Sequence, residues 1–461
     1  MGVFKKTAFF FVLSLLVFSC ASRSNPFKEI DNAVNLNDFE RGIDAIRKGQ
    51  EGINKLYPER NAISLFLDKG LLEHYAGNFF ESSKDLEEAE RLIEEAFTRS
   101  ITAEIASYII NDKIREYPGE DYEDIYINII NALNYYQANN IEEAMVEIRK
   151  ITISSGKLDM LSRKYATSSK SAGDWVVEQL KSLGLQIDPA LPQGTPVNFS
   201  NSALARYLSV LFYDSLGDAD NARLEAEHLK AAFADNKKIY NFPIPKAASE
   251  IQNIPEGMAR LNVIGFSGLS PIKEEKLYPG FFPFFINDPL RRIQFRLPVF
   301  VDRKSKNPID RIEVTVNNPE RAGAGRRFNL ELIENLGEVM RETYNARFSN
   351  LYLKTYIRTM TKYAAADIAA TKIGKESDSS LAAFGSALAA KVTIDASEGA
   401  DTRMSRYFPD KAYIGGINLR PGTYTVTATY YSGPIVIAED NARDINVLVN
   451  KLNLIETFCL R

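Results

Sequence analysis

The chain has 461 residues, of which 45% are apolar, 25% charged and 11% aromatic, and its 56 Lys and Arg against 60 Asp and Glu give a net charge of -4. This balance excludes a disordered, collagen-like or multi-span membrane protein. The small net charge argues against nucleic acid as the partner. The length allows two or three domains of about 150 residues each.

Residues 1–19 read as an export signal, with two lysines before an apolar core that ends at Phe18 and is too short to span a bilayer. The motif Val17-Phe18-Ser19-Cys20 resembles the lipobox of bacterial lipoproteins. That resemblance implies that Cys20 is acylated and becomes the new N-terminus. Ala21 and Ser22 follow it, and the absence of Asp there favours sorting to the outer membrane. The alternative is a plain signal peptide in which the cysteine has no role.

Residues 20–235 are predicted to be helical, because apolar side chains recur every three or four residues. A helix-turn-helix pattern returns around Asn37, Gly77, Asn139 and Gly217. Gly or Asn at such a point favours a left-handed turn, and small residues nearby allow close helix crossing. The stretch 63–96 resembles a tetratricopeptide unit. The uneven spacing of the turns predicts degenerate, interrupted repeats.

Residues 236–257 hold three prolines and are predicted to be a linker or an extended arm across the helical layer. Residues 258–461 are predicted to form a C-terminal α+β domain with a mainly antiparallel sheet. Pro298 is expected on an edge strand. A helical insert is expected at 329–370, followed by an alanine-rich stretch at 381–390. The alternating or bounded apolar runs that predict strands are at 261–266, 293–301, 312–316, 423–431 and 445–449.

The residues that usually carry chemistry give no strong pattern. His74 and His228 fall on predicted helices and are expected to pack or to lie at the surface, and Cys459 lies near the end of the chain. The acidic run at 119–124 matches no EF-hand and is expected to begin a helix. Gly323-Ala324-Gly325 and Gly374-Lys375-Glu376 are expected to be turns. We therefore predict no catalytic residue, no cofactor-binding residue, no metal ligand and no cofactor.

An aromatic segment stands apart from these patterns. Four phenylalanines lie among chain breakers, so they either cover a core or contact a partner or a bilayer. Because Pro279, Gly280 and Pro283 prevent regular alternation, we expect at least two of the four rings to be partly exposed. The candidate contact residues are Phe281, Phe282, Phe284 and Phe285.

Three stretches, at 117–150, 265–271 and 400–426, together resemble a family of tetratricopeptide-type lipoproteins of double-membraned bacteria. The resemblance implies a cell-envelope lipoprotein with no assigned activity. Met404-Ser405-Arg406 replaces a Ser-Trp pair expected after Asp401-Thr402-Arg403, and we expect Asp401 and Arg403 to form a local ion pair.

The function that these features favour is a lipid-anchored scaffold or assembly factor, bound to the outer membrane, whose helical repeats bind an envelope protein or peptide. The alternative is an envelope enzyme, for example a glycan hydrolase with a carboxylate pair that the sequence does not single out.

Overall fold

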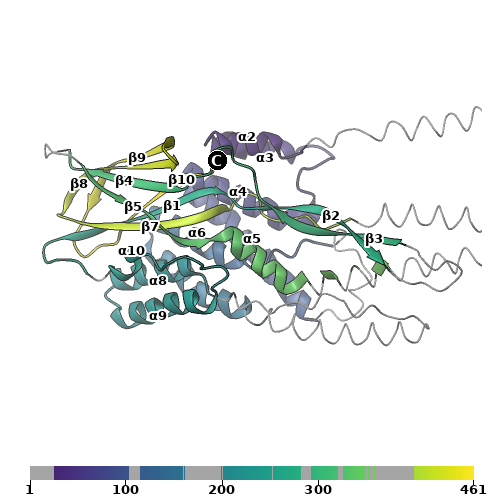
Figure 1. Cartoon of the computed structure of the whole chain (residues 1–461), viewed down its shortest axis with the longest axis horizontal. Coiled ribbons are helices and arrows are strands. Elements are labelled where there is room, and N and C mark those ends of the chain that lie inside the picture. The colour runs from purple at the N-terminus through teal and green to yellow at the C-terminus, as the bar shows by residue number, and fades with distance from the viewer. Residues whose placement is uncertain are drawn as a thin grey trace, which may run out of the picture.

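A computed structural model shows a helical N-terminal half and a C-terminal half built on antiparallel-rich sheets, as expected (Figure 1). None of the described helices is long and apolar enough to cross a membrane. The predicted lipobox and the residues Phe282, Phe284 and Phe285 lie outside the described residues. Those described are 25–102, 115–158, 160, 199, 201–251, 253–281, 292–319, 325–348, 351–352, 355, 358–359 and 399–461.

Within the described residues the N-terminal half forms four helix hairpins. The first pairs α2 (Lys28–Asn35) with α3 (Phe39–Gly49), and the second pairs α4 (Ala62–Ala76) with α5 (Phe79–Thr102). The third pairs α6 (Glu123–Gln137) with a helix that begins at 141 and runs to 158. The fourth pairs α8 (Ala203–Ser215) with α9 (Ala219–Asp235).

The turn of every hairpin contains a left-handed residue at the predicted place. The φ angles are 55° at Asn37, 83° at Gly77, 58° at Asn139 and 75° at Gly217. After three of these residues a side chain caps the next helix by accepting from a backbone N–H, as Asp218 does from Asn221 at 3.2 Å. The predicted helix-turn-helix units are therefore confirmed, although nothing here identifies them as tetratricopeptide repeats.

The hairpins stack side by side in chain order, with their turns along one edge. The Asn78 side chain in the second turn donates to Glu40 at the start of α3 across 2.9 Å. His74 and Asn134, near the ends of α4 and α6, lie 2.6 Å apart. The Tyr136 ring near the third turn lies 5.9 Å from the Phe212 ring of α8. These contacts align all four turns.

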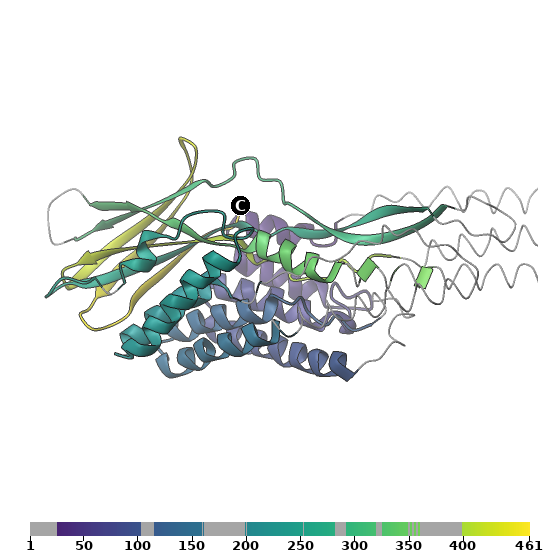
Figure 2. The ribbon, with the colours of Figure 1, turned by 60° about the horizontal axis from the view of Figure 1, so that its bottom comes forward.

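The ten described strands form two four-stranded sheets and a two-stranded ribbon. The inner sheet has the order β10 (Asn453–Cys459), β1 (Ala259–Leu269), β7 (Pro409–Leu419) and β6 (Glu331–Asn335). The outer sheet has the order β5 (Arg326–Asn329), β4 (Arg311–Asn317), β8 (Gly422–Ser432) and β9 (Ile435–Val447). The ribbon pairs β2 (Ile272–Phe281) with β3 (Arg292–Val301) and extends away from both sheets (Figures 1 and 2).

Both faces of the inner sheet are buried. Along β1, Leu261 and Val263 pack against the outer sheet, whereas Ile264 and Phe266 belong to the core shared with the helices. This alternation follows from the two-residue period of a strand. The helices α4, α6 and α8 contact this sheet through Tyr75, Tyr136 and Tyr207, and the second helices α5 and α9 pack against α4 and α8. The helical layer lies below the sheets in Figure 2. The helical half and the strands therefore share one continuous core.

The strand predictions at 261–266, 293–301, 312–316 and 423–431 are confirmed, and the ribbon pairing of β3 makes Pro298 an edge residue. The prediction of a helix from residue 329 is wrong at its start. Residues 331–335 form β6, and the helix begins at 336 and is described to 348. Ile333 is fully buried in the core shared with the helices, and this burial outweighs the helix-forming composition. At the last predicted strand, β9 ends at Val447.

The proline-rich stretch 236–257 lies against the folded body. Ile239 and Tyr240 are buried, and α10 (Lys246–Ser249) follows them. The Tyr240 ring stacks on Phe233 of α9 at 4.7 Å. This stretch therefore contributes side chains to the shared core.

Candidate functional site

Of the four candidate contact residues in the aromatic segment, the structure describes Phe281 alone. Phe281 is the last residue of β2 and pairs with Arg292 at the start of β3. Phe282, Phe284 and Phe285 lie outside the described residues, and so does Cys20. Their expected exposure remains a prediction.

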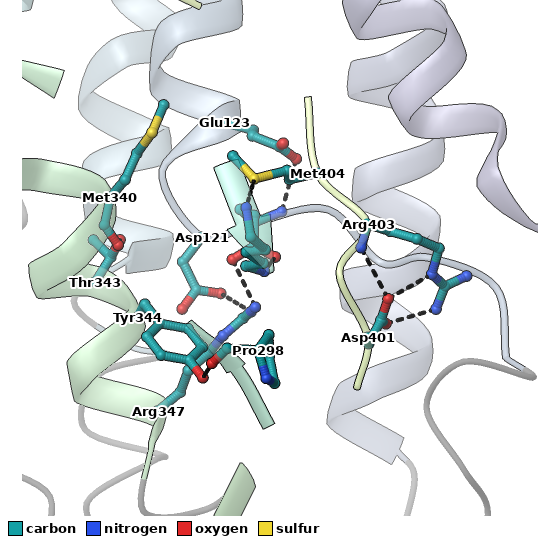
Figure 3. Close-up of polar contacts among 12 residues, drawn as sticks. Asp121, Glu123, Pro298, Met340, Thr343, Tyr344, Arg347, Asp401, Arg403 and Met404 are labelled. Carbon is teal, nitrogen blue, oxygen red and sulfur yellow. Dashed lines mark hydrogen bonds and ion pairs between the residues drawn. The ribbon is translucent and has the colours of Figure 1, made fainter. Parts of the chain in front are cut away.

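Buried and half-buried polar side chains gather where the segment 399–408 meets the helices and the ribbon (Figure 3). We call this set the ionic junction. Its members are Asp31, Asp68, Glu120, Glu123, Lys273, Arg303, Arg347, Asp401, Arg403, Ser405 and Arg406.

The expected ion pair between Asp401 and Arg403 is confirmed. Two guanidinium nitrogens of Arg403 donate to the Asp401 carboxylate at 2.8 and 2.7 Å (Figure 3). A third donates to the backbone carbonyls of Arg60 and Arg115 at 3.1 and 2.7 Å. Although burial raises the pKa of Asp401, its contacts with Arg403 hold that pKa below its ordinary value. The pair fixes this segment to two connections of the helical half.

Met404, Ser405 and Arg406, which follow this ion pair, are all used in contacts. Met404 is buried, and its sulfur accepts from the Lys273 backbone N–H at 3.2 Å (Figure 3). Ser405 donates its hydroxyl to Asp68 of α4 at 2.8 Å, and Arg406 donates its backbone N–H to the same oxygen at 2.6 Å. The segment therefore attaches the strands to the second hairpin.

Asp68 is fully buried and accepts three hydrogen bonds. The third comes from the Tyr57 hydroxyl at 2.6 Å, to the other carboxylate oxygen. Burial raises the pKa of Asp68 to about 6, against the opposing effect of the donated hydrogen bonds. Asp68 interrupts an apolar stretch of α4, and this position was the sequence signal for a buried, partnered carboxylate.

Lys273 of β2 lies at the centre of the ionic junction. Its ammonium forms a buried ion pair with Glu120, whose other oxygen accepts from Arg347 at 2.6 Å. The ammonium also lies 5.7 Å from the ring centroids of both Phe300 and Tyr344. Burial lowers the pKa of Lys273, although the charge of Glu120 opposes this. Lys273 thus joins the ribbon to the segment before α6 and to the helix at 336–348.

The predicted helix start in the acidic run is confirmed, because α6 begins at Glu123 with acids in its first turn. The Glu123 carboxylate accepts from the backbone N–H of Glu120 at 2.7 Å and of Ser405 at 3.1 Å. Burial first, and the charge of Glu120 second, raise the pKa of Glu123 to about 8. This carboxyl group ties α6 to the same segment as Asp68.

Outside the ionic junction, the buried carboxylate of Glu334 in β6 connects the inner sheet to the helices. It accepts from the Ser202 hydroxyl at 2.7 Å, the Leu204 N–H at 2.8 Å, and the hydroxyls of Tyr240 at 2.7 Å and Tyr126 at 3.1 Å. Burial raises the pKa of Glu334. Sequence reasoning missed this residue because it was assigned to a helix.

Both histidines lie on helices, one packed in the interior and one near the surface, as the sequence predicts. His74 is buried and contacts Asn134 and, at 3.2 Å, Glu456 of β10, whereas His228 lies near the surface of α9 beside Glu225. In the described parts of the chain no three His, Cys, Asp or Glu side chains are grouped to hold a metal ion. Gly325 precedes β5, and the other predicted glycine turns lie outside the described residues.

Asp68, Glu120, Glu123 and Glu334 each accept from donors of a different element. Such an arrangement fixes the relative positions of helices, ribbon and sheet, since a buried charge is stable only when paired or hydrogen-bonded. Comparison of the chain with protein-family models, curated proteins and solved structures found no match.

Proposed function

We propose that the protein is a lipid-anchored scaffold of the cell envelope, held at the outer membrane by acylated Cys20, whose degenerate tetratricopeptide-like hairpins bind a protein partner. The lipobox-like sequence at residues 17–20 supports the proposed location at the outer membrane. The stack of four hairpins supports binding, because stacked hairpins present an extended surface. The observation that carries the proposal is that the C-terminal half covers one face of this stack, whereas the second helices α5 and α9 pack on α4 and α8 from the other side.

The covered face is that of the first helices. Tyr75 of α4 donates to the Tyr407 carbonyl at 3.0 Å, Tyr136 of α6 to the Leu452 carbonyl at 2.8 Å, and Tyr207 of α8 to Asn262 at 3.4 Å. The C-terminal half of the chain thus occupies this face. A partner would therefore bind the face made by the second helices.

This second face is acidic along α5. The exposed and half-buried side chains of that helix include six Glu against three Lys and Arg, a difference of three negative charges (3 minus 6), because Asp85 is buried against Lys69 of α4. Glu88 and Glu95 lie on its exposed side, paired with Arg91. The charge favours a partner with a basic surface.

Crosslinking in envelope extracts tests the proposal. The wild type should retain a stoichiometric partner, and Glu88→Lys with Glu95→Lys should lose it several-fold. The matched control is Glu274→Lys with Glu439→Lys, two exposed acids on strands, which should retain it. Equal capture by both double variants, or capture of no partner by the wild type, would contradict binding through this face.

A further inference from the structure

The connection between α3 and the 3-10 helix η1 (Glu59–Asn61) is a closed loop at 50–57. Its neck is fastened by the Gln50 amide, which donates to the Tyr57 carbonyl at 3.0 Å and accepts from the Tyr57 N–H at 2.8 Å. The Leu56 N–H also donates to the Gly49 carbonyl at 2.6 Å. The loop therefore has a defined base, from which residues 51–55 project.

The tip of this loop carries one large apolar side chain, Ile53, between Glu51 and Lys55, and it is open to solvent. Ile53 is 100% exposed and follows Gly52, whose φ of 80° turns the chain at the tip. A single exposed isoleucine is common on protein surfaces. The place of this one, beside the start of the mature chain, distinguishes it.

The loop base lies against the first residues of the folded body. The Phe27 ring contacts the Tyr57 ring with centroids 5.5 Å apart, and Arg406 covers Phe27 at 4.2 Å. Cys20 precedes Asn25 by five residues, which span at most ~17 Å when extended. An acyl anchor on Cys20 would therefore hold this end of the helical stack within that distance of a bilayer surface.

We propose that the tip of loop 50–57 enters the surface of the bilayer that holds the anchor, with Ile53 as the inserted side chain. This inference rests on the proposed lipid anchoring. Within the loop itself the exposed charges balance, with Glu51 against Lys55, so the contact depends on the apolar Ile53 side chain and little on salt.

One consequence is an orientation for the whole protein. The loop follows the C-terminal end of α3, whereas the row of hairpin turns lies at the N-terminal end of α3. With 11 residues α3 spans roughly 16 Å. The row of hairpin turns, including exposed Leu216, is therefore directed away from the bilayer.

The test uses the mature, acylated full chain on vesicles of phosphatidylethanolamine and phosphatidylglycerol. A polarity-sensitive dye is placed at Ile53→Cys and, as the control, at Leu216→Cys; Cys459 is fully buried and should not react. We expect the emission at position 53 to shift to shorter wavelength on vesicles and to become several-fold less accessible to iodide, at low and high salt alike. The emission at position 216 should not change.

Hydrogen exchange removes the contribution of the dye. Residues 51–55 of the wild type should gain protection on vesicles, Ile53→Ser should lose this gain, and Leu216→Ser should keep it. A position 53 that stays in water on an acylated, vesicle-bound protein would overturn the inference and leave the anchoring intact. A protein without acyl chains would overturn both, and a shift seen in intact envelopes but not in vesicles would assign the tip to a protein partner instead.

Discussion

Ser405 and Asp68 are 337 residues apart in sequence, and the hydroxyl of the first donates to the carboxylate of the second across 2.8 Å. This bond joins the segment after the helical insert to the second hairpin. Because Asp68 is fully buried, the Ser405, Arg406 and Tyr57 donors depend on its carboxylate as their hydrogen-bond acceptor. The relationship makes the stability of the helical half depend on the C-terminal half.

Replacing Asp68 tests this dependence. Asp68→Ala leaves the Ser405, Arg406 and Tyr57 donors without their acceptor and should lower the free energy of unfolding by roughly 3–5 kcal/mol. Asp68→Asn keeps one accepting oxygen and should cost less, about 1–2 kcal/mol. Urea denaturation measures both. Asp44→Ala, which removes an exposed pair with Arg47, is the control and should change stability by less than about 1 kcal/mol.

The raised pKa of Glu123 predicts a pH dependence. A value of about 8, above the ordinary 4.5, means that the folded protein keeps a proton that the unfolded chain releases. The free energy of unfolding should therefore fall as the pH rises from about 4.5 to about 8, by a few kcal/mol from this group. Glu123→Gln should flatten the profile, as measured by denaturation at several pH values. An unchanged slope in this variant would contradict the assignment.

The buried pair of Lys273 and Glu120 predicts a large single-variant effect with partial recovery. Lys273→Met should cost about 3 kcal/mol, because it leaves a buried carboxylate with Arg347 alone. Adding Glu120→Gln should restore part of the loss, which a double-mutant cycle measures. The exposed pair of Lys84 and Glu81 is the matched control, and Lys84→Met should have little effect. Full additivity of the two buried substitutions would argue against direct coupling.

Close helix crossing in the second hairpin predicts a glycine effect. A Cβ at Gly70 of α4 would lie 2.8 Å from Leu86 of α5, so Gly70→Ala should lower the melting temperature by several degrees, about 1–3 kcal/mol of stability. Gly156, in the helix at 141–158, has no atom within 4 Å of such a Cβ, and Gly156→Ala should stabilise by roughly 0.5–1 kcal/mol. Calorimetry distinguishes the two, and equal shifts would show that crowding is not the cause.

The proposed anchor is tested without reference to the partner. Labelling cells with a clickable palmitate should mark the wild type, and Cys20→Ala should abolish both the label and cleavage before residue 20. The label and the mass of the mature N-terminus are the measurements. An unlabelled wild type that is cleaved elsewhere would favour the plain signal peptide.

The sequence by itself determined the features that depend on near neighbours along the chain. The left-handed turns at Asn37, Gly77, Asn139 and Gly217 were predictable because Gly and Asn tolerate that backbone region at small cost. The strand at 312–316 was predictable because its side chains alternate between core and surface.

Only the tertiary structure decided which polar residues are buried together. Residues 331–335 have the composition of a helix, yet they form β6 because Glu334 meets four donors from the helical half and Ile333 fills the shared core. Likewise, the sequence around Lys273 does not reveal that its partner Glu120 lies 153 residues away. A desolvated charge is stable only in the presence of distant partners, and local propensity carries no information about them.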